Sequence, residues 1–154
     1  MKPIAIFLLA AGFAVSAGDP VGFYQWKGSE LKDMAAHLAP KLTAAGSASD
    51  SLAKMENYSF GANFRKTSGG AEIHKTNTDV FVVESGEATL IVGGTIPDGK
   101  ESQPNEVRGT SITGGVEKQI SGGDVITIAA GTPHQMKVAP GKEIAYLAIK
   151  IAKP

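Results

Sequence analysis

Short β-rich segments dominate the chain from residue 57 onward. They are rich in valine, isoleucine, phenylalanine, tyrosine and threonine, and turn-forming glycine, proline, asparagine or serine separates each from the next. Regularly spaced short strands of this kind predict a β-sandwich or a β-barrel. The expected strands cover residues 58–65, 71–75, 79–84, 88–92, 125–128, 135–138 and 144–151, and the polar stretch 97–106 is expected to be a long surface loop.

The segment from Ser29 to about Met55 has a helical pattern instead. Ser29 suits an N-cap, Pro40 is expected to break or kink the helix, and the stretch 44–49 predicts a loop before a short helical turn over 52–55. The expected organisation is a helical segment over 18–56 and a β domain over 57–154. The apolar residues that recur at helical spacings of three and four are Leu31, Met34, Leu38 and Leu42.

Residues 1–17 have the pattern of a secretory signal peptide. Lys2 gives a positive start, an apolar run follows over 4–14, and the small residues over 15–17 suit cleavage by a signal peptidase. A membrane anchor is the alternative, although the uncharged stretch is shorter than the ~20 residues that a comfortable span needs. We therefore expect an exported protein, periplasmic or secreted, whose mature chain begins near Gly18 and is not integral to the membrane.

The composition limits the partners of the chain. Its 154 residues fit one domain, and 15 basic and 15 acidic side chains leave no net charge. This balance argues against nucleic acid or an anionic membrane and favours a small molecule or another protein. Because the chain has no cysteine, its stability must come from core packing, helped by a metal or by oligomerisation. The segment 29–55 with the first strand is a candidate homodimer contact.

Ionisable side chains gather at two points of the expected β domain. Glu72 and His74 lie two apart on one strand, so they share a face, and Asp79 begins the next strand. His134 follows a Gly-Thr-Pro turn that is expected to point it inward. Ionisable groups that face a core are costly unless they are paired or bind a cation. Two imidazoles with one or two carboxylates suit a divalent ion such as Mn, Fe(II), Ni or Zn.

Two motifs in this region resemble those of the cupins, a superfamily of small double-sheet β-barrels of the jelly-roll type. The first cupin motif has the form G-x5-H-x-H-x(3,4)-E-x6-G, and E-I-H-x4-D-x6-G at residues 72–86 matches its ligand portion. The second has the form G-x5-P-x-G-x2-H-x3-N, and G-x5-A-x-G-x2-H at residues 123–134 matches most of it. The resemblance implies a single cupin barrel preceded by a short helical segment.

The resemblance also implies which side chains bind a metal. In cupins, two histidines and an acid of the first motif hold a divalent ion together with the histidine of the second. His74 and His134 occupy histidine positions, Asp79 stands where the family usually has glutamate, and Glu72 stands where it usually has histidine. Both replacements keep a side chain able to bind metal, although the shorter Asp79 reaches less far. Glu72 could instead be a solvated residue at the barrel mouth or a hydrogen-bond partner of a ligand.

The sequence supports more than one function for such a barrel. An enzyme would be a metal-dependent oxygenase, isomerase or lyase, because no nucleophilic triad is recognisable; an unbound Glu72 or Asp79 would then be the base. The alternatives are a non-catalytic barrel that captures a metal or a small ligand, and a purely structural barrel. Glu106 and Arg108 lie two apart, where they could face a substrate or anchor a loop through a salt bridge. His37 is expected to be structural.

Overall fold

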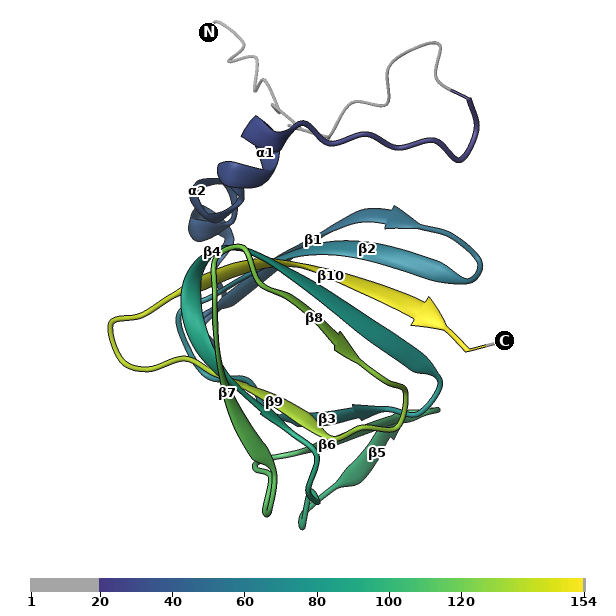
Figure 1. Ribbon diagram of the computed structural model, residues 1–154, viewed down its shortest axis with the longest axis vertical. Coiled ribbons are helices and arrows are strands. Elements are labelled where there is room, and N and C mark those ends of the chain that lie inside the picture. Colours follow the sequence, from purple (N-terminus) through teal and green to yellow (C-terminus); the bar gives the residue numbers. More distant parts are fainter. Residues whose placement is uncertain (1–19, 154) are drawn as a thin grey trace, which may run out of the picture.

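The computed structural model describes residues 20–153, so the predicted signal segment 1–17 lies outside the described residues. Two short helices and a 3-10 turn precede ten strands in the described part of the chain (Figure 1). The helical elements are α1 (Gly28–Lys32), α2 (Met34–Leu38) and η1 (Ala39–Lys41). The strands are β1 (Ser47–Lys54), β2 (Tyr58–Arg65), β3 (Ala71–His74), β4 (Asn77–Val92), β5 (Lys100–Gln103), β6 (Glu106–Gly109), β7 (Val116–Ser121), β8 (Val125–Ile128), β9 (His134–Lys137) and β10 (Ile144–Ala152).

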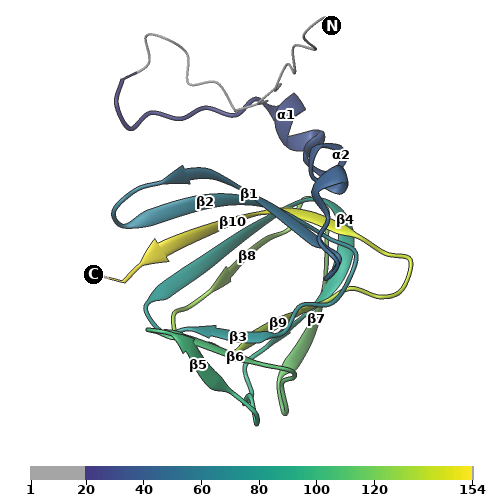
Figure 2. The ribbon, with the colours of Figure 1, turned by 180° about the vertical axis from the view of Figure 1, so that it is seen from behind.

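The strands form two antiparallel layers that face each other and share the long strand β4, as Figures 1 and 2 show from opposite sides. The first layer has the order β1-β2-β10-β4-β8. The second has the order β7-β4-β9-β3-β6-β5. The predicted β-sandwich or barrel is confirmed, and its interior lies between the two layers.

Apolar side chains fill one part of this interior. Because successive side chains of a strand alternate between its faces, every second residue of β4, β9 and β10 points inward. The inner core packs Phe81, Val83, Ala88, Leu90, Ile120, Ile128, Met136, Val138, Ile144 and Tyr146 against one another. The same alternation carries polar residues of β4, β9 and β10 to the inside at Asp79, His134 and Lys150, where the core gives way to a charged cluster.

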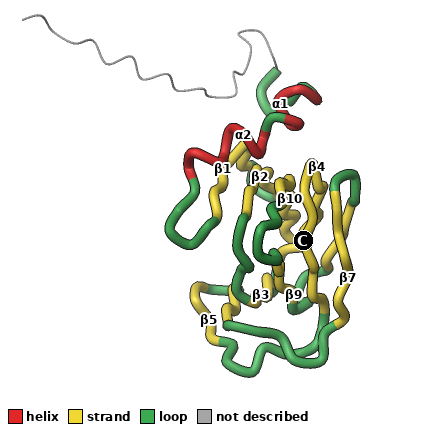
Figure 3. The backbone as a smooth tube through the Cα atoms, turned by 90° about the vertical axis from the view of Figure 1, so that its left-hand side faces the viewer, coloured by secondary structure: helices red, strands yellow, loops and turns green. Residues whose placement is uncertain are grey.

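The helices cover the outer face of the first layer, near β1, β2 and β10 (Figure 3). Met34 and Leu38 of α2 are buried there against a second apolar cluster that includes Phe64 and Leu147. The helical spacing of Leu31, Met34 and Leu38 thus predicted the buried helix face. The helix changes to a 3-10 turn at Ala39–Lys41, where Pro40 cannot donate the hydrogen bond of a regular helix.

The predicted loop over 44–49 is confirmed only for residues 44–46, and the predicted helical turn over 52–55 is wrong. Residues Ser47–Lys54 form strand β1, which pairs with β2 from Ser47 opposite Arg65 to Lys54 opposite Ser59. The sequence of β1, SASDSLAK, is rich in serine and alanine, which have little preference for strands. Pairing with β2 therefore determines its conformation, and the sheet begins at Ser47 rather than at residue 57.

Two further differences concern the later strands. The predicted strands 79–84 and 88–92 are one strand, β4, whose pairing with β10 shifts register beside Gly86. Gly86 has φ +79°, and a Cβ there would lie 2.0 Å from the carbonyl oxygen of Glu143, so glycine lets the strand bend without ending. Strands β5, β6 and β7 were not predicted, and β5 lies in the stretch expected to be a loop. No helix in residues 20–153 is long and apolar enough to cross a membrane.

Candidate metal centre

Cross-strand neighbours build the charged cluster from both layers. In the second layer, Glu72 of β3 lies opposite His134 of β9 on one side and Arg108 of β6 on the other. His74 of β3 lies opposite Glu106 of β6. In the first layer, Asp79 of β4 lies opposite Lys150 of β10. Directly opposite residues of antiparallel strands share a face, so each pair projects into the interior together.

The structure brings together the four side chains that the sequence singled out. The Nε2 atoms of His74 and His134 lie 3.3 Å from Oδ2 of Asp79. Glu72 lies 3.8 Å from His74 Nε2 through Oε2 and 3.4 Å from His134 Nε2 through Oε1. His74, Asp79 and His134 are each at most 3% exposed, whereas the Glu72 side chain is 24% exposed. Asp79 is therefore long enough to reach both imidazoles.

Both imidazoles are held by the ring nitrogen that faces away from the cluster. His74 Nδ1 lies 2.6 Å from Oε2 of Glu106, and His134 Nδ1 lies 3.0 Å from the carbonyl oxygen of Thr132. Because both partners are acceptors, each Nδ1 carries the proton and each Nε2 presents a lone pair to the cluster. This arrangement is typical of metal-binding histidines, whose second nitrogen donates to a carboxylate or carbonyl oxygen.

The turn before β9 directs His134 inward, as the Gly-Thr-Pro sequence predicted. Gly131 has φ +83°, and its N–H donates to the carbonyl oxygen of His74 over 2.8 Å. The carbonyl oxygen of Pro133 accepts a hydrogen bond from the N–H of Gly93 over 2.8 Å. The turn is thus tied to β3 and to the end of β4. Gln135 points away from His134 and donates to the carbonyl oxygens of Gly69 and Thr110 instead.

Sequence reasoning missed Lys150, whose ammonium group enters the cluster. Its Nζ donates to His74 Nε2 over 2.8 Å and to Oδ1 of Asp79 over 2.9 Å. The side chain is 37% exposed, so it extends from the open end of the barrel to the buried carboxylate. Tyr146, Ala148 and Lys150 lie two residues apart along β10, so they share its inner face. This period of two was the sequence signal that Lys150 points inward.

Glu106 and Arg108 connect to the same cluster. Arg108 forms ion pairs with Glu72 and with Oε2 of Glu106, the latter over 3.4 Å. Glu106 in turn accepts the hydrogen bond from His74. The salt bridge expected of these residues is present, and it fixes two side chains of the cluster instead of anchoring a loop.

Burial and neighbouring charges shift the pKa values of the cluster. Burial lowers the pKa of His74 below its usual 6.5, and the charge of Lys150 adds to this effect against the nearby carboxylates. Burial would raise the pKa of Asp79, but its neighbours, with the charge and the hydrogen bond of Lys150 among them, more than offset this effect and hold that pKa below its usual value of 3.8. The resulting state is a neutral imidazole at His74 beside an ionised carboxylate at Asp79.

The donor set fits a divalent metal ion. Glu72, His74 and His134 each offer one ligand atom, and these atoms lie within 4.8 Å of one another. Nε2 of His134 is buried and has no hydrogen-bond partner, because with the proton on Nδ1 both Nε2 and the nearby Asp79 oxygen are acceptors. A buried acceptor without a partner is costly, and a metal ion would satisfy it. Imidazole nitrogens with carboxylate oxygens suit Mn, Fe, Ni or Zn.

Comparison with known proteins shows similarity in structure only, since no family model and no curated protein matches the sequence. A conserved protein with a double-stranded β-helix domain from Klebsiella pneumoniae aligns with a TM-score of 0.58 and 11% identity, over 84% of this chain and 90% of that one. The cupin domain of Cnp3 from Schizosaccharomyces pombe aligns with a TM-score of 0.53 and 13% identity, over 75% of this chain and 72% of that domain.

The chain has a cupin fold. The polyketide cyclase RemF from Streptomyces resistomycificus is also similar, with a TM-score of 0.50 and 16% identity over 69% of this chain, which spans 65% of the length of the cyclase. The expected jelly-roll barrel is therefore confirmed. At these identities the likeness concerns the fold alone.

Proposed function

We propose that this cupin binds one divalent transition metal ion between its two layers and uses the site to bind or transform a small molecule. The observation that supports the metal most strongly is the paired orientation of the histidines. His74 and His134 both donate from Nδ1 to a fixed oxygen and present Nε2 to the same carboxylates. Glu72, His74 and His134 would hold the ion, and Asp79 would be a further ligand or would balance its charge.

The cluster has the parts that either a binding or a catalytic function needs. A bound divalent ion would supply Lewis-acid chemistry. Glu106 would keep the proton on His74 Nδ1, and Arg108 would orient Glu72 through their ion pair. Lys150 would supply a positive charge at the open side of the site. A non-catalytic barrel that only captures a metal or a ligand remains the second candidate function, because the same contacts serve it.

Elemental analysis tests the metal. The protein would be purified without chelators, and its metal content compared with that of His134→Gln and of His37→Gln, whose histidine lies on α2 outside the barrel. About one equivalent of a single transition metal in the wild type and in His37→Gln, and its loss in His134→Gln, is the expected result. Absence of metal in the wild type, also after incubation with Mn, Fe, Ni or Zn salts, would reject the proposal.

The place of action and the assembly are part of the proposal. The pattern of residues 1–17 supports export, and the mass of the protein from an exported fraction tests it: a chain beginning near Gly18 is expected, and an intact N-terminus would contradict it. Residues 29–55 with β2 are proposed as a homodimer contact. Sedimentation showing only monomers would rule that contact out.

A further inference from the structure

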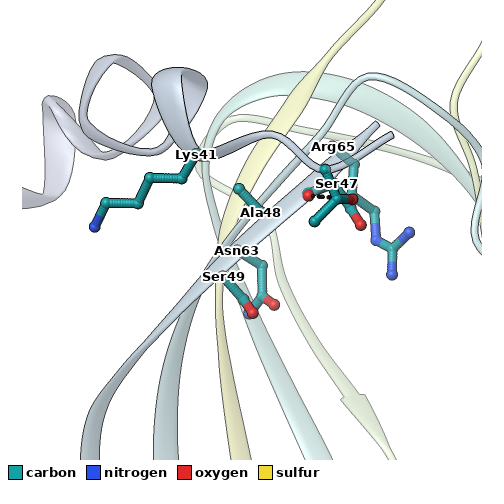
Figure 4. A pocket seen from close by; sticks show the side chains of 7 residues that line it. Lys41, Ser47, Ala48, Ser49, Asn63 and Arg65 are labelled. Carbon is teal, nitrogen blue, oxygen red and sulfur yellow. Dashed lines mark hydrogen bonds between the residues drawn. The ribbon is translucent and has the colours of Figure 1, made fainter. Parts of the chain in front are cut away.

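A second polar site shares no residue with the metal cluster. A pocket of about 240 Å³ is lined by Lys41, Thr43, Ser47, Ala48, Ser49, Asn63 and Arg65 (Figure 4). Ser47 lies opposite Arg65 and Ser49 opposite Asn63 across the β1–β2 pair, so these four side chains share a face. Asn63 lies opposite Tyr146, which belongs to the inner core. The pocket is therefore at the β1 edge of the first layer, where these four side chains lie on the inner side, whereas Ala48 and Lys41 belong to the outer side.

The lining is rich in hydrogen-bond donors and has no carboxylate. Ser47 and Ser49 contribute hydroxyl groups that bond to no other side chain in residues 20–153, and Asn63 uses its amide nitrogen on the carbonyl oxygen of Gly61. The Asn63 side-chain oxygen remains available as an acceptor. The ammonium of Lys41 is held by Asp50 and His37, and Figure 4 shows it at the end of the pocket opposite Arg65. Arg65 is thus the cation available to a ligand.

Arg65 is a half-buried guanidinium with no ion pair in the described part of the chain. Its Nε donates to the hydroxyl oxygen of Tyr146 over 3.3 Å, and its terminal nitrogens lie against Gly69, where a Cβ would be 3.0 Å from Nη1. Burial, and then the charge of Arg65, lowers the pKa of Arg108, so two guanidinium groups share the interior. Arg108 is already paired with Glu72 and Glu106, so Arg65 is the guanidinium whose charge a bound anion would neutralise.

We infer that this pocket binds a small organic anion that carries a carboxylate and hydroxyl groups. The planar guanidinium of Arg65 offers two parallel N–H donors that match the geometry of a carboxylate. The hydroxyl groups of Ser47 and Ser49 and the oxygen of Asn63 suit the hydroxyl groups of such a ligand. A neutral polyol would leave Arg65 unpaired, and a phosphate would leave the hydroxyl side of the pocket unused.

Calorimetric titration with sodium D-gluconate tests this inference, with D-glucose as the neutral analogue and inorganic phosphate as the second anion. The purified protein is kept in a chelator, so that binding cannot depend on the metal proposed above. Gluconate is expected to bind more tightly than glucose and phosphate. Arg65→Met should weaken gluconate binding about tenfold or more, as expected for a lost charged hydrogen bond.

Lys66→Met is the matched control, because it removes the same charge next to Arg65 from a lysine that is outside the pocket and pairs with Glu143. It should leave gluconate binding unchanged. If Arg65→Met fails to fold, Arg65→Lys and the exposed Ser49→Ala replace it, and both should weaken gluconate binding. Equal binding of glucose, tighter binding of phosphate, no binding of gluconate, or unchanged binding in the Arg65 variants would each overturn the assignment.

Discussion

At the scale of single residues, Lys150 distinguishes this cluster from a simple set of metal ligands. Its ammonium donates to the His74 lone pair that a metal would use and to the buried Asp79. A metal ion and the ammonium cannot both occupy the space in front of that lone pair, so metal binding requires Lys150 to move. Its partial exposure gives the side chain room to do so beside the shallow pocket formed with Lys54 and Glu56.

Lys150→Met should therefore bind zinc about tenfold more tightly than the wild type, because the charged hydrogen bond that competes for His74 is lost. Competition with a chromophoric chelator measures the affinity. Lys153→Met is the control, since it removes the same charge from an exposed position past the end of β10. Equal zinc affinity in Lys150→Met and the wild type would show that the ammonium does not compete.

The lowered pKa of His74 predicts how the metal-free protein responds to acid. Burial makes the folded state take up a proton at His74 less readily than the unfolded state does. This contribution to the free energy of unfolding is complete above pH 6.5 and is lost as the pH falls below 6.5 toward the lower folded pKa, by up to about 1.4 kcal/mol per pH unit.

Urea unfolding in chelator between pH 7.5 and about 5 checks the sign, in a range above the usual carboxylate pKa values. His74→Gln should have a flatter dependence of the free energy of unfolding on pH, whatever its absolute stability. The expectation fails if the wild type and the variant lose stability equally over this range.

At the scale of elements, strands with a clear local sequence pattern could be predicted, whereas a strand whose conformation depends on pairing could not. β-Branched and aromatic residues identified β2, β4 and β10. The spacing of two between Glu72 and His74 placed both side chains on the inner face. The serine-rich β1 has no such signal, because its conformation comes from pairing with β2. Arg65 could not be predicted as a site residue for the same reason, because its pocket forms only when β1 pairs with β2.

The helices and the cluster lie on opposite faces of the first layer. A substitution under the helices should therefore change the stability of the fold without changing metal affinity. Leu38 of α2 is fully buried in the outer apolar cluster. Leu38→Ala should lower the free energy of unfolding by about 2–4 kcal/mol through the cavity it leaves, with metal affinity unchanged. Urea unfolding and a zinc titration measure the two effects. Val125→Ala, at a 68% exposed position of β8, should change neither, and a loss of zinc affinity in Leu38→Ala would contradict the separation.

At the scale of the whole molecule, the cluster joins segments that are distant in sequence and belong to different layers. His74 and Glu72 come from β3, His134 from β9 and Asp79 from β4. The sequence could name these residues from two motifs, but their mutual distances follow from the closure of the barrel. The period of two along each strand could indicate that Lys150 and Arg108 face inward, but which cluster residue each one meets follows from cross-strand pairing.

A metal ion at this position would hold the two layers together and should raise the thermal stability of the protein. A ligand that binds only the folded state stabilises it by about 2.7 kcal/mol when its free concentration is 100 times its dissociation constant. Thermal unfolding with and without zinc should show a higher midpoint with the metal, and His134→Gln should abolish the rise while retaining the fold in chelator. Because unfolded chains also bind metals weakly through histidines, His37→Gln is the appropriate control and should keep the full rise. A rise of equal size in His134→Gln would place the stabilising ion elsewhere on the molecule.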